Sequence, residues 1–283
     1  MKITKGKLVN GIEQLVYLMA RLRKPETGCP WDIKQDFLSI VPHTLEESYE
    51  VVDAIERGDF DHLQEELGDL FFQVIFYSQM AKEQALFGFD DVLDSLVNKL
   101  LERHPHVFPD GTLKSERDVD APSDTALIKK NWENLKVKER ALKGERGRLA
   151  DIPLALPALT RAQKIQKRAS HHGFDWPDCQ GVLDKVEEEL AELREAFDSN
   201  NAQHIEEELG DLIFSCVNFG RHQGFDVEAS VRKANKKFEK RFHEMEVMSE
   251  AAGEFFDALP LARKNALWQH VKEAEKGKIS KTC

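Results

Sequence analysis

The chain has 283 residues, with 51 acidic and 40 basic side chains, a formal net charge of −11 and a sequence pI of about 5.5. This length suits one large domain or two modest ones, each able to bury its own core. The acidic balance argues against a nucleic-acid-binding surface as the main function.

No stretch reaches the roughly 20 apolar residues that a membrane-spanning helix needs, so we expect no membrane partner. The N-terminus is basic, but Glu13 and Gln14 interrupt the apolar run that follows, and no small-residue cleavage site is present. The four cysteines are Cys29, Cys179, Cys216 and Cys283. They form neither a CxxC pair nor a zinc-ligand spacing, which favours free thiols in a reducing compartment. We therefore expect a soluble, cytoplasmic protein.

Apolar periodicity predicts an all-α fold without a convincing strand. The helices expected in the first half are Gly11–Leu22, one that begins at Thr44 and ends before Gly58, one from His62 to about Gln84, and Val92–Arg103. We expect Thr44 to be an N-cap, because Glu47 three residues later would complete a capping box.

The middle of the chain has the composition of a linker. Residues Pro109 to Asp124 are rich in Pro, Gly, Asp and Ser, a charged helix is expected from Ala126 to about Leu142, and a second linker region follows from Gly144 to Pro157. The sequence therefore predicts an N-terminal repeat at 1–124, a linker with a charged helix at 125–150 and a C-terminal repeat at 151–283.

The second half repeats the order of the first. A helix from Leu156 to about Ser170 is followed by GFDWPD, which matches GCPWD in the first half, and the last shared helix aligns VRKANKKFEKRF with LVNKLLERHP. Each half thus has about four helices, and a four-helix bundle is the economical way to bury their apolar stripes.

Two acidic clusters lie in the helical stretch from Val182 to Phe214. Residues three or four apart share a helix face, so Glu189 and Glu192 point one way from one helix, and Glu208 and Asp211 do so from the next. Converging like charges are costly unless they are protonated or neutralised by a cation. Four carboxylates from an antiparallel helix pair suit a hard divalent ion such as Mg²⁺. A solvated acidic face is the ordinary alternative for such a run.

A second copy of the pattern favours the metal site. Both repeats contain EELGDL, and Glu47 and Glu66 are nineteen residues apart, as are Glu189 and Glu208. Solvated faces drift in spacing and identity, so a repeat that keeps both indicates a shared site. The second predicted metal site comprises Glu47, Glu50, Glu66 and Asp69.

The order EExxE, ExxD and a downstream KxxxR resembles the MazG family of nucleoside triphosphate pyrophosphohydrolases. The resemblance covers nearly the whole chain, including GCPWD, TLEESYE, the EELGDL strings, RAQKIQKR and KANKKFEKRF. It implies an all-α fold, a homodimer with helices shared across subunits, and Mg²⁺ dependence. It also implies hydrolysis of ribo- and deoxynucleoside triphosphates to the monophosphate and pyrophosphate.

Carried onto matching positions, the resemblance implies the metal ligands Glu189, Glu192, Glu208 and Asp211. The implied nucleotide contacts are Lys185, Glu188, Glu207, Lys237, Arg241 and Trp268. Lys185 and Glu188 are also the expected catalytic residues. Lys185 would hold phosphate oxygens as a fixed cation, and Glu188 would accept a proton from the attacking water or hydrogen-bond it.

The two halves differ beside this pattern. His43 stands where the C-terminal half has Lys185, and the N-terminal half lacks the dense RAQKIQKR helix. We therefore expect the C-terminal half to carry most of the activity, and the N-terminal half to be a weaker, differently selective or mainly structural copy.

The acidic motif has three alternative explanations. A di-iron carboxylate bundle needs Glu-x-x-His on two helices, and no Glu here has His three residues later. A narrow, dUTPase-like housecleaning hydrolase shares the acidic motif and stays open. A non-enzymatic helical regulator that binds a nucleotide or a protein partner also stays open.

Overall fold

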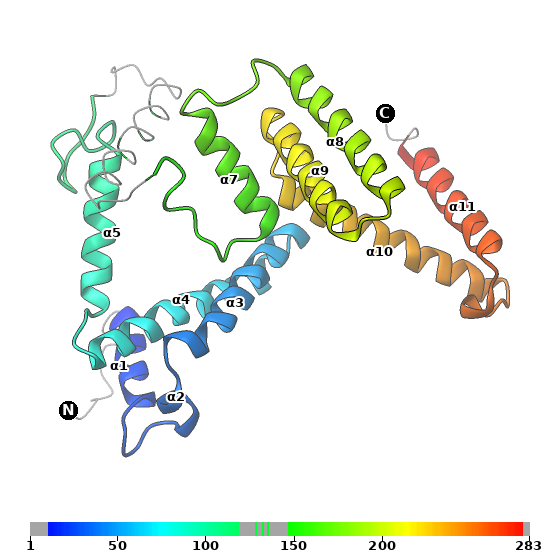
Figure 1. Ribbon diagram of the computed structural model, residues 1–283. Helices are drawn as coiled ribbons and strands as arrows, with labels where there is room; N and C mark the ends of the chain where they lie inside the picture. The colour runs from blue at the N-terminus through cyan, green and yellow to red at the C-terminus, as the bar shows by residue number, and fades with distance from the viewer. Residues whose placement is uncertain (1–10, 119–127, 129–131, 133–134, 136–146, 280–283) are drawn as a thin grey trace. The chain divides into compact units, whose positions relative to one another are not determined.

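The computed structural model describes residues 11–118, 128, 132, 135 and 147–279, and every regular element over these residues is helical (Figure 1). The predicted all-α fold is confirmed. The chain divides into two compact units, residues 1–136 and 137–283, and the division falls within the stretch where the sequence predicts a linker. The predicted helix from Ala126 to about Leu142 lies outside the described residues, apart from Ile128, Trp132 and Leu135, which are helical.

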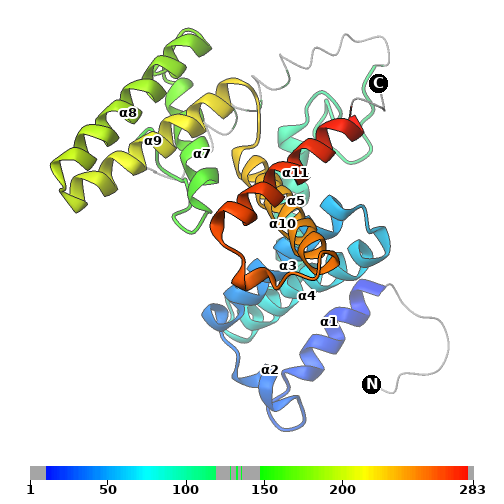
Figure 2. The same ribbon diagram turned by 90° about the vertical axis from the view of Figure 1, so that its right-hand side faces the viewer.

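The first unit consists of a helical hairpin and the shorter helices around it. Its helices are α1 (Gly11–Leu22), α2 (Pro30–Lys34), α3 (Phe37–Arg57), α4 (Phe60–Glu83) and α5 (Phe89–Arg103). Helices α3 and α4 lie side by side, and α1 and α5 both contact α4 (Figures 1 and 2). The bounds of α1 agree with the prediction, whereas α5 begins three residues before the predicted Val92, because Gly88 serves as its N-cap.

The predicted start of the first acidic helix is wrong. Helix α3 begins at Phe37, where Asp36 accepts a hydrogen bond from the backbone N–H of Ser39 (2.8 Å), and the hydroxyl of Ser39 accepts one from the backbone N–H of Asp36 (2.9 Å). Thr44 therefore lies inside the helix, where its hydroxyl contacts the hydroxyl of Tyr77 on α4 (2.9 Å). The helix continues through Pro42, which lacks the N–H that would pair with the carbonyl of Leu38.

The core of the first unit lies where α1, α3, α4 and α5 meet. Met19, Ile40, Ile75, Phe76 and Met80 are almost completely buried and form one cluster. Burying side chains of this size contributes about 1.5–3 kcal/mol each. The core therefore fixes the α3–α4 hairpin that carries the N-terminal acidic residues.

The second unit contains two helix pairs. Its helices are α7 (Ala158–Ser170), α8 (Cys179–Ser199), α9 (Ala202–His222), α10 (Val227–Ala251), the 3-10 turn η1 (Phe256–Ala258) and α11 (Leu261–Ile279). Helices α8 and α9 pack against each other, as do α10 and α11, and α7 packs on α9 (Figures 1 and 2). Met245, Leu267 and Val271 form a buried cluster between α10 and α11.

A tight turn joins α8 to α9. Asn200 has a left-handed backbone conformation (φ 54°), and Asn201 caps α9 by accepting hydrogen bonds from the backbone N–H groups of Gln203 and His204. Asparagine tolerates both positions well. The short turn brings the two acidic helices together in antiparallel orientation.

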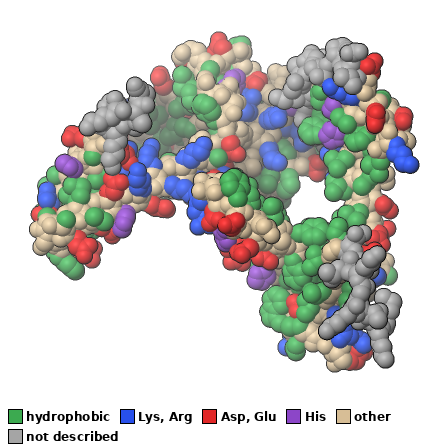
Figure 3. Space-filling model, turned by 180° about the vertical axis from the view of Figure 1, so that it is seen from behind, with side chains coloured by type: hydrophobic (Ala, Val, Ile, Leu, Met, Phe, Trp, Pro, Cys, Tyr) green, Lys and Arg blue, Asp and Glu red, His purple; other side chains and the backbone are tan. Residues whose placement is uncertain are grey.

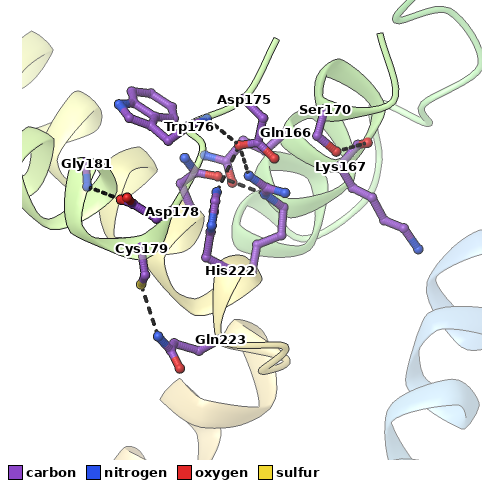
Figure 4. Close-up of polar contacts among 12 residues, drawn as sticks. Gln166, Lys167, Ser170, Asp175, Trp176, Asp178, Cys179, Gly181, His222 and Gln223 are labelled. Carbon is purple, nitrogen blue, oxygen red and sulfur yellow. Dashed lines mark hydrogen bonds and ion pairs between the residues drawn. The ribbon is translucent and has the colours of Figure 1, made fainter. Parts of the chain in front are cut away.

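The loop between α7 and α8 is held against the end of α9 by one carboxylate. Asp175 accepts hydrogen bonds from the side chains of Arg221 and His222 and from the backbone N–H of Trp176 (Figure 4). This loop contains the GFDWPD string and leads directly into α8. Among the helices described here, none combines the length and the apolar character needed to cross a membrane.

Candidate metal and nucleotide site

The α8–α9 hairpin brings three of the predicted metal ligands together. One carboxylate oxygen each from Glu189, Glu208 and Asp211 lies within 4.8 Å of the other two. Glu189 is only 5% exposed, and burial of an unpaired carboxylate is costly, so its surroundings must supply positive charge or hydrogen bonds. The acidic run is therefore not a solvated helix face throughout.

The α3–α4 hairpin repeats this arrangement. Oxygens of Glu47, Glu66 and Asp69 satisfy the same 4.8 Å limit, and Glu66 is 7% exposed. The fourth predicted ligand of each site, Glu50 or Glu192, lies outside the set in which all oxygens are this close. The repeat seen in the sequence is thus a repeat of side-chain geometry.

Each cluster also contains a histidine that the sequence analysis missed. His62 Nε2 lies 3.0 Å from Glu66 Oε1, and His204 Nε2 lies 3.1 Å from Glu208 Oε1. Both histidines precede their glutamate by four residues, which is one helical turn. A histidine three residues before each EELGDL string was the signal in the sequence that could have identified them. A neighbour of this kind fixes the orientation of a carboxylate that binds a metal.

The two clusters differ at Lys185. Its Nζ lies 2.7 Å from Glu188 Oε1 and 2.8 Å from Glu189 Oε1, and these two hydrogen bonds raise the pKa of Lys185, so the side chain remains a cation at neutral pH. His43, the corresponding residue of the first unit, lies 3.6 Å from Glu46 and packs edge-on against Trp31. The C-terminal cluster therefore has a permanent positive charge where the N-terminal cluster has a histidine.

Crowding of the carboxylates changes their titration. Burial, then the charges of Asp69, Glu50 and Glu66, raise the pKa of Glu47. Burial also raises the pKa of Glu192, followed by the charges of Glu189 and Glu208, although Lys185 opposes this. Negative charge is therefore concentrated in both hairpins.

The remaining predicted nucleotide contacts lie on three helices. Glu207 is exposed on α9 and accepts a hydrogen bond from Gln203 Nε2 (3.4 Å). Lys237 and Arg241 are one turn apart on α10, and the guanidinium of Arg241 lies 5.6 Å from the ring centre of Trp268 on α11. The structure thus places the guanidinium of Arg241 over the ring of Trp268. No hydrogen bond or ion pair links this group to the acidic cluster among the residues that the structure describes.

The acidic clusters fit a divalent cation by their donor set. Every member of each set offers carboxylate oxygen, the ligand type that Mg²⁺ prefers, and the oxygens come from two packed helices. The sets contain no sulfur ligand. Hard, oxygen-seeking ions therefore suit these sites better than zinc or copper.

The fold and the site define an all-α protein with two helical hairpins, each of which brings carboxylates together. Comparisons with known proteins agree with this class. The family model of the MazG nucleotide pyrophosphohydrolase domain matches residues 35–108 and 179–246, which contain the two acidic hairpins. The chain belongs to the MazG family.

Two relatives match almost from end to end, and a third matches over about half of its length. A nucleoside triphosphate pyrophosphohydrolase of Escherichia coli K12 is 47% identical over 94% of this chain and 99% of its own length. A nucleoside triphosphate pyrophosphohydrolase/pyrophosphatase MazG of Thermotoga maritima is 42% identical over 92% of this chain and 95% of its own. A nucleoside triphosphate pyrophosphohydrolase of Mycolicibacterium smegmatis is 35% identical over 57% of this chain and 48% of its own.

Proposed function

We propose that this protein hydrolyses nucleoside triphosphates to nucleoside monophosphates and pyrophosphate in a Mg²⁺-dependent reaction. The observation that carries the proposal is the convergence of carboxylate oxygens from Glu189, Glu208 and Asp211, with Glu189 buried, in a MazG-family chain. The relatives' names specify nucleoside triphosphates as a class and not one nucleotide, which favours broad over dUTPase-like specificity.

The C-terminal acidic hairpin would hold the metal through Glu189, Glu208 and Asp211, with Glu192 as a further ligand. A bound Mg²⁺ would neutralise phosphate oxygens and make an attacking water more acidic. His204 would keep the carboxylate of Glu208 oriented.

Glu188 and Lys185 would act on the reacting groups. A water oxygen attacks the α-phosphorus, the bond from that phosphorus to the α–β bridging oxygen breaks, and pyrophosphate leaves with the bonding electron pair. Glu188, which is exposed on α8, would accept the proton lost by the water. Lys185 would stabilise the negative charge on the phosphate oxygens.

The nucleotide's other contacts would come from Glu207, Lys237, Arg241 and Trp268. Arg241 presents a guanidinium suited to phosphate oxygens, and Trp268 offers an aromatic ring for a base. Lys237 is exposed and one turn away from Arg241.

The protein would work as a homodimer. Large apolar side chains remain exposed on both acidic hairpins, including Leu38, Phe60 and Leu67 in the first unit, and Phe197 and Leu209 in the second. Figure 3 shows hydrophobic side chains gathered at the surface beside acidic ones on one face. Large apolar side chains exposed in this number favour burial in a protein–protein contact.

The N-terminal hairpin would be a second cation site with weaker or different activity. Glu47, Glu66 and Asp69 converge as their counterparts do, and Glu50 lies nearby. His43 stands at the position where the C-terminal hairpin has the cation of Lys185. The N-terminal site would therefore bind the phosphates of a nucleoside triphosphate more weakly.

Product analysis with ATP and Mg²⁺ tests the proposal. Purified protein should convert ATP to AMP and pyrophosphate, and chelation of the metal with EDTA should stop the reaction until Mg²⁺ is restored. Release of ADP and phosphate would contradict cleavage at the α-phosphorus. Tight binding of ATP without turnover would support the non-enzymatic regulator instead, and a panel of common and damaged nucleotides would expose a narrow specificity.

A further inference from the structure

Helix α11 holds the guanidinium of Arg241 from two sides. Arg241 Nε donates a hydrogen bond to Glu275 Oε2 (2.8 Å), and Nη2 lies 2.7 Å from the same oxygen. The ring of Trp268 lies 5.6 Å from the guanidinium carbon. Trp268 and Glu275 are seven residues apart, which is two helical turns, so both face α10.

The pairing with Glu275 uses only one edge of the guanidinium. An arginine has five N–H donors, and Glu275 occupies the edge formed by Nε and Nη2. Nη1, with its two N–H groups, has no hydrogen-bond partner within the described ranges. The arrangement therefore fixes the plane of the group and leaves donors for an anion.

The ion pair is largely shielded from water. The side chains of Arg241 and Glu275 are 19% and 20% exposed, whereas Lys240, 3.8 Å from Glu275, is 66% exposed. A shielded pair restricts a side chain more than an exposed one does, because water competes less for its hydrogen bonds. The hydrogen bond from Arg241 and the charges of Lys240 and Lys237 lower the pKa of Glu275, so this residue is a carboxylate at neutral pH.

The packing around Trp268 fixes the position of its ring beside Arg241. Trp268 packs against the cluster of Met245, Leu267 and Val271, and its ring also lies 5.3 Å from that of Phe238. The ring is therefore held by both helices. Arg241 stands between a fixed ring and a fixed carboxylate.

We propose that Glu275 is a positioning residue, which holds the guanidinium of Arg241 over Trp268 so that its remaining N–H groups meet the phosphates of a nucleoside triphosphate. This inference rests on the proposed function, because it assigns Arg241 to phosphate. Glu275 itself does not touch the substrate. Without it, Arg241 samples several rotamers, and the nucleotide must restrict them on binding.

The test compares Glu275→Gln with a matched control in the full-length protein. Glu254→Gln is that control, because Glu254 pairs with Arg263 (3.0 Å) elsewhere on the α10–α11 hairpin and has no assigned part in binding. Glu275→Gln should raise the KM for ATP at least about tenfold with a smaller change in kcat. Glu254→Gln should leave the KM within about twofold of the original, although both variants lose one ion pair.

A double-mutant cycle separates positioning from folding. In an Arg241→Ala background, Glu275→Gln should have almost no further effect on KM, because the group that it positions is gone. Equal losses of thermal stability in the two glutamine variants with an unchanged KM in both would overturn the proposal. A lower KM in Glu275→Gln would also overturn it, since Glu275 would then compete with phosphate for Arg241.

Binding of the uncleavable analogue α,β-methylene-ATP with Mg²⁺ keeps this inference separate from the proposed reaction. Calorimetry should show at least about tenfold weaker binding for Glu275→Gln than for the original protein. If the original protein binds the analogue and releases no pyrophosphate from ATP, the proposed hydrolysis fails and the Kd values alone decide the role of Glu275. If the original protein does not bind the analogue, both proposals fail.

Discussion

Asp175 is a single residue that holds the loop between α7 and α8 in place. Its carboxylate accepts hydrogen bonds from Arg221 and His222, whose side chains are 13% and 14% exposed (Figure 4). Burial raises the pKa of Asp175, but these hydrogen bonds and charges outweigh burial and hold the pKa below its ordinary value. The interaction stabilises the entry into α8, the helix that carries Lys185.

Replacement of Asp175 should make stability less dependent on pH. A carboxyl whose pKa is lower in the folded state contributes stability above its unfolded pKa of about 3.9, and this contribution is lost as pH falls through the folded pKa. Asp175→Asn should therefore destabilise the protein by about 1–3 kcal/mol at neutral pH and by less at about pH 3. Urea unfolding followed by circular dichroism at the two pH values measures the difference.

The control for this experiment is Asp184→Asn. Asp184 is exposed on α8 and accepts a hydrogen bond from Gln180 one turn away, so its loss should cost less than about 0.5 kcal/mol. A cost for Asp175→Asn that stays constant from neutral to acid pH would contradict the assigned role of its charge.

At the scale of the helix, periodicity predicted the elements and local capping decided their ends. The apolar stripe gave the bounds of α1 correctly. Thr44 was a wrong N-cap because two sequence signals competed: the Thr-x-x-Glu pattern of Thr44 and Glu47 favoured a start at residue 44, while Asp36 and Ser39 form the capping box in the folded chain. The extra helical turns bring Ile40 into the core of the first unit.

The cap at Asp36 gives a direct test of that correction. Asp36→Ala should lower the free energy of unfolding of the first unit by about 0.5–2 kcal/mol, because the first backbone N–H groups of α3 lose their acceptor. Thr44→Ser keeps the hydroxyl that contacts Tyr77 and should be nearly neutral. Thermal unfolding of both variants measures this, and an Asp36→Ala variant as stable as the unmodified protein would contradict the cap at Asp36.

At the scale of the whole molecule, duplication placed two similar hairpins in one chain with different charges beside them. The acidic sets match residue for residue, and each has a histidine one turn before its glutamate. Lys185 distinguishes the second hairpin, since it contributes a cation that His43 does not. This difference supports an unequal division of activity.

Paired substitution tests the division. Glu189→Ala should lower kcat/KM for pyrophosphate release from ATP by about a hundredfold or more, because a buried ligand of the proposed metal is lost. Glu47→Ala should leave most of the activity on several nucleotides. Glu187→Ala, an exposed neighbour on α8, serves as the matched control and should behave as the unmodified protein does.

The reverse pattern of activities would contradict the proposed division between the two halves. If Glu47→Ala abolishes turnover while Glu189→Ala does not, the active half is the N-terminal one. Circular dichroism spectra of all three variants must match that of the unmodified protein, so that loss of activity is not loss of fold.

The sequence by itself determined the helical class, the duplication and the faces on which the carboxylates lie. These follow from spacing along one helix, since residues such as Glu208 and Asp211 share a face wherever the helix packs. Spacing could not show that Glu189 is buried or that Glu192 stands apart from the closest three oxygens.

Only the tertiary structure decided which residues of different helices meet. The pairing of Arg241 with Glu275, and the hydrogen bonds from Arg221 and His222 to Asp175, join side chains separated by 34, 46 and 47 residues. Their partners depend on how α10 meets α11 and how a loop meets α9, and one-dimensional periodicity contains no information on either. Packing between helices sets these contacts, because close-packed side chains allow few arrangements of two helices.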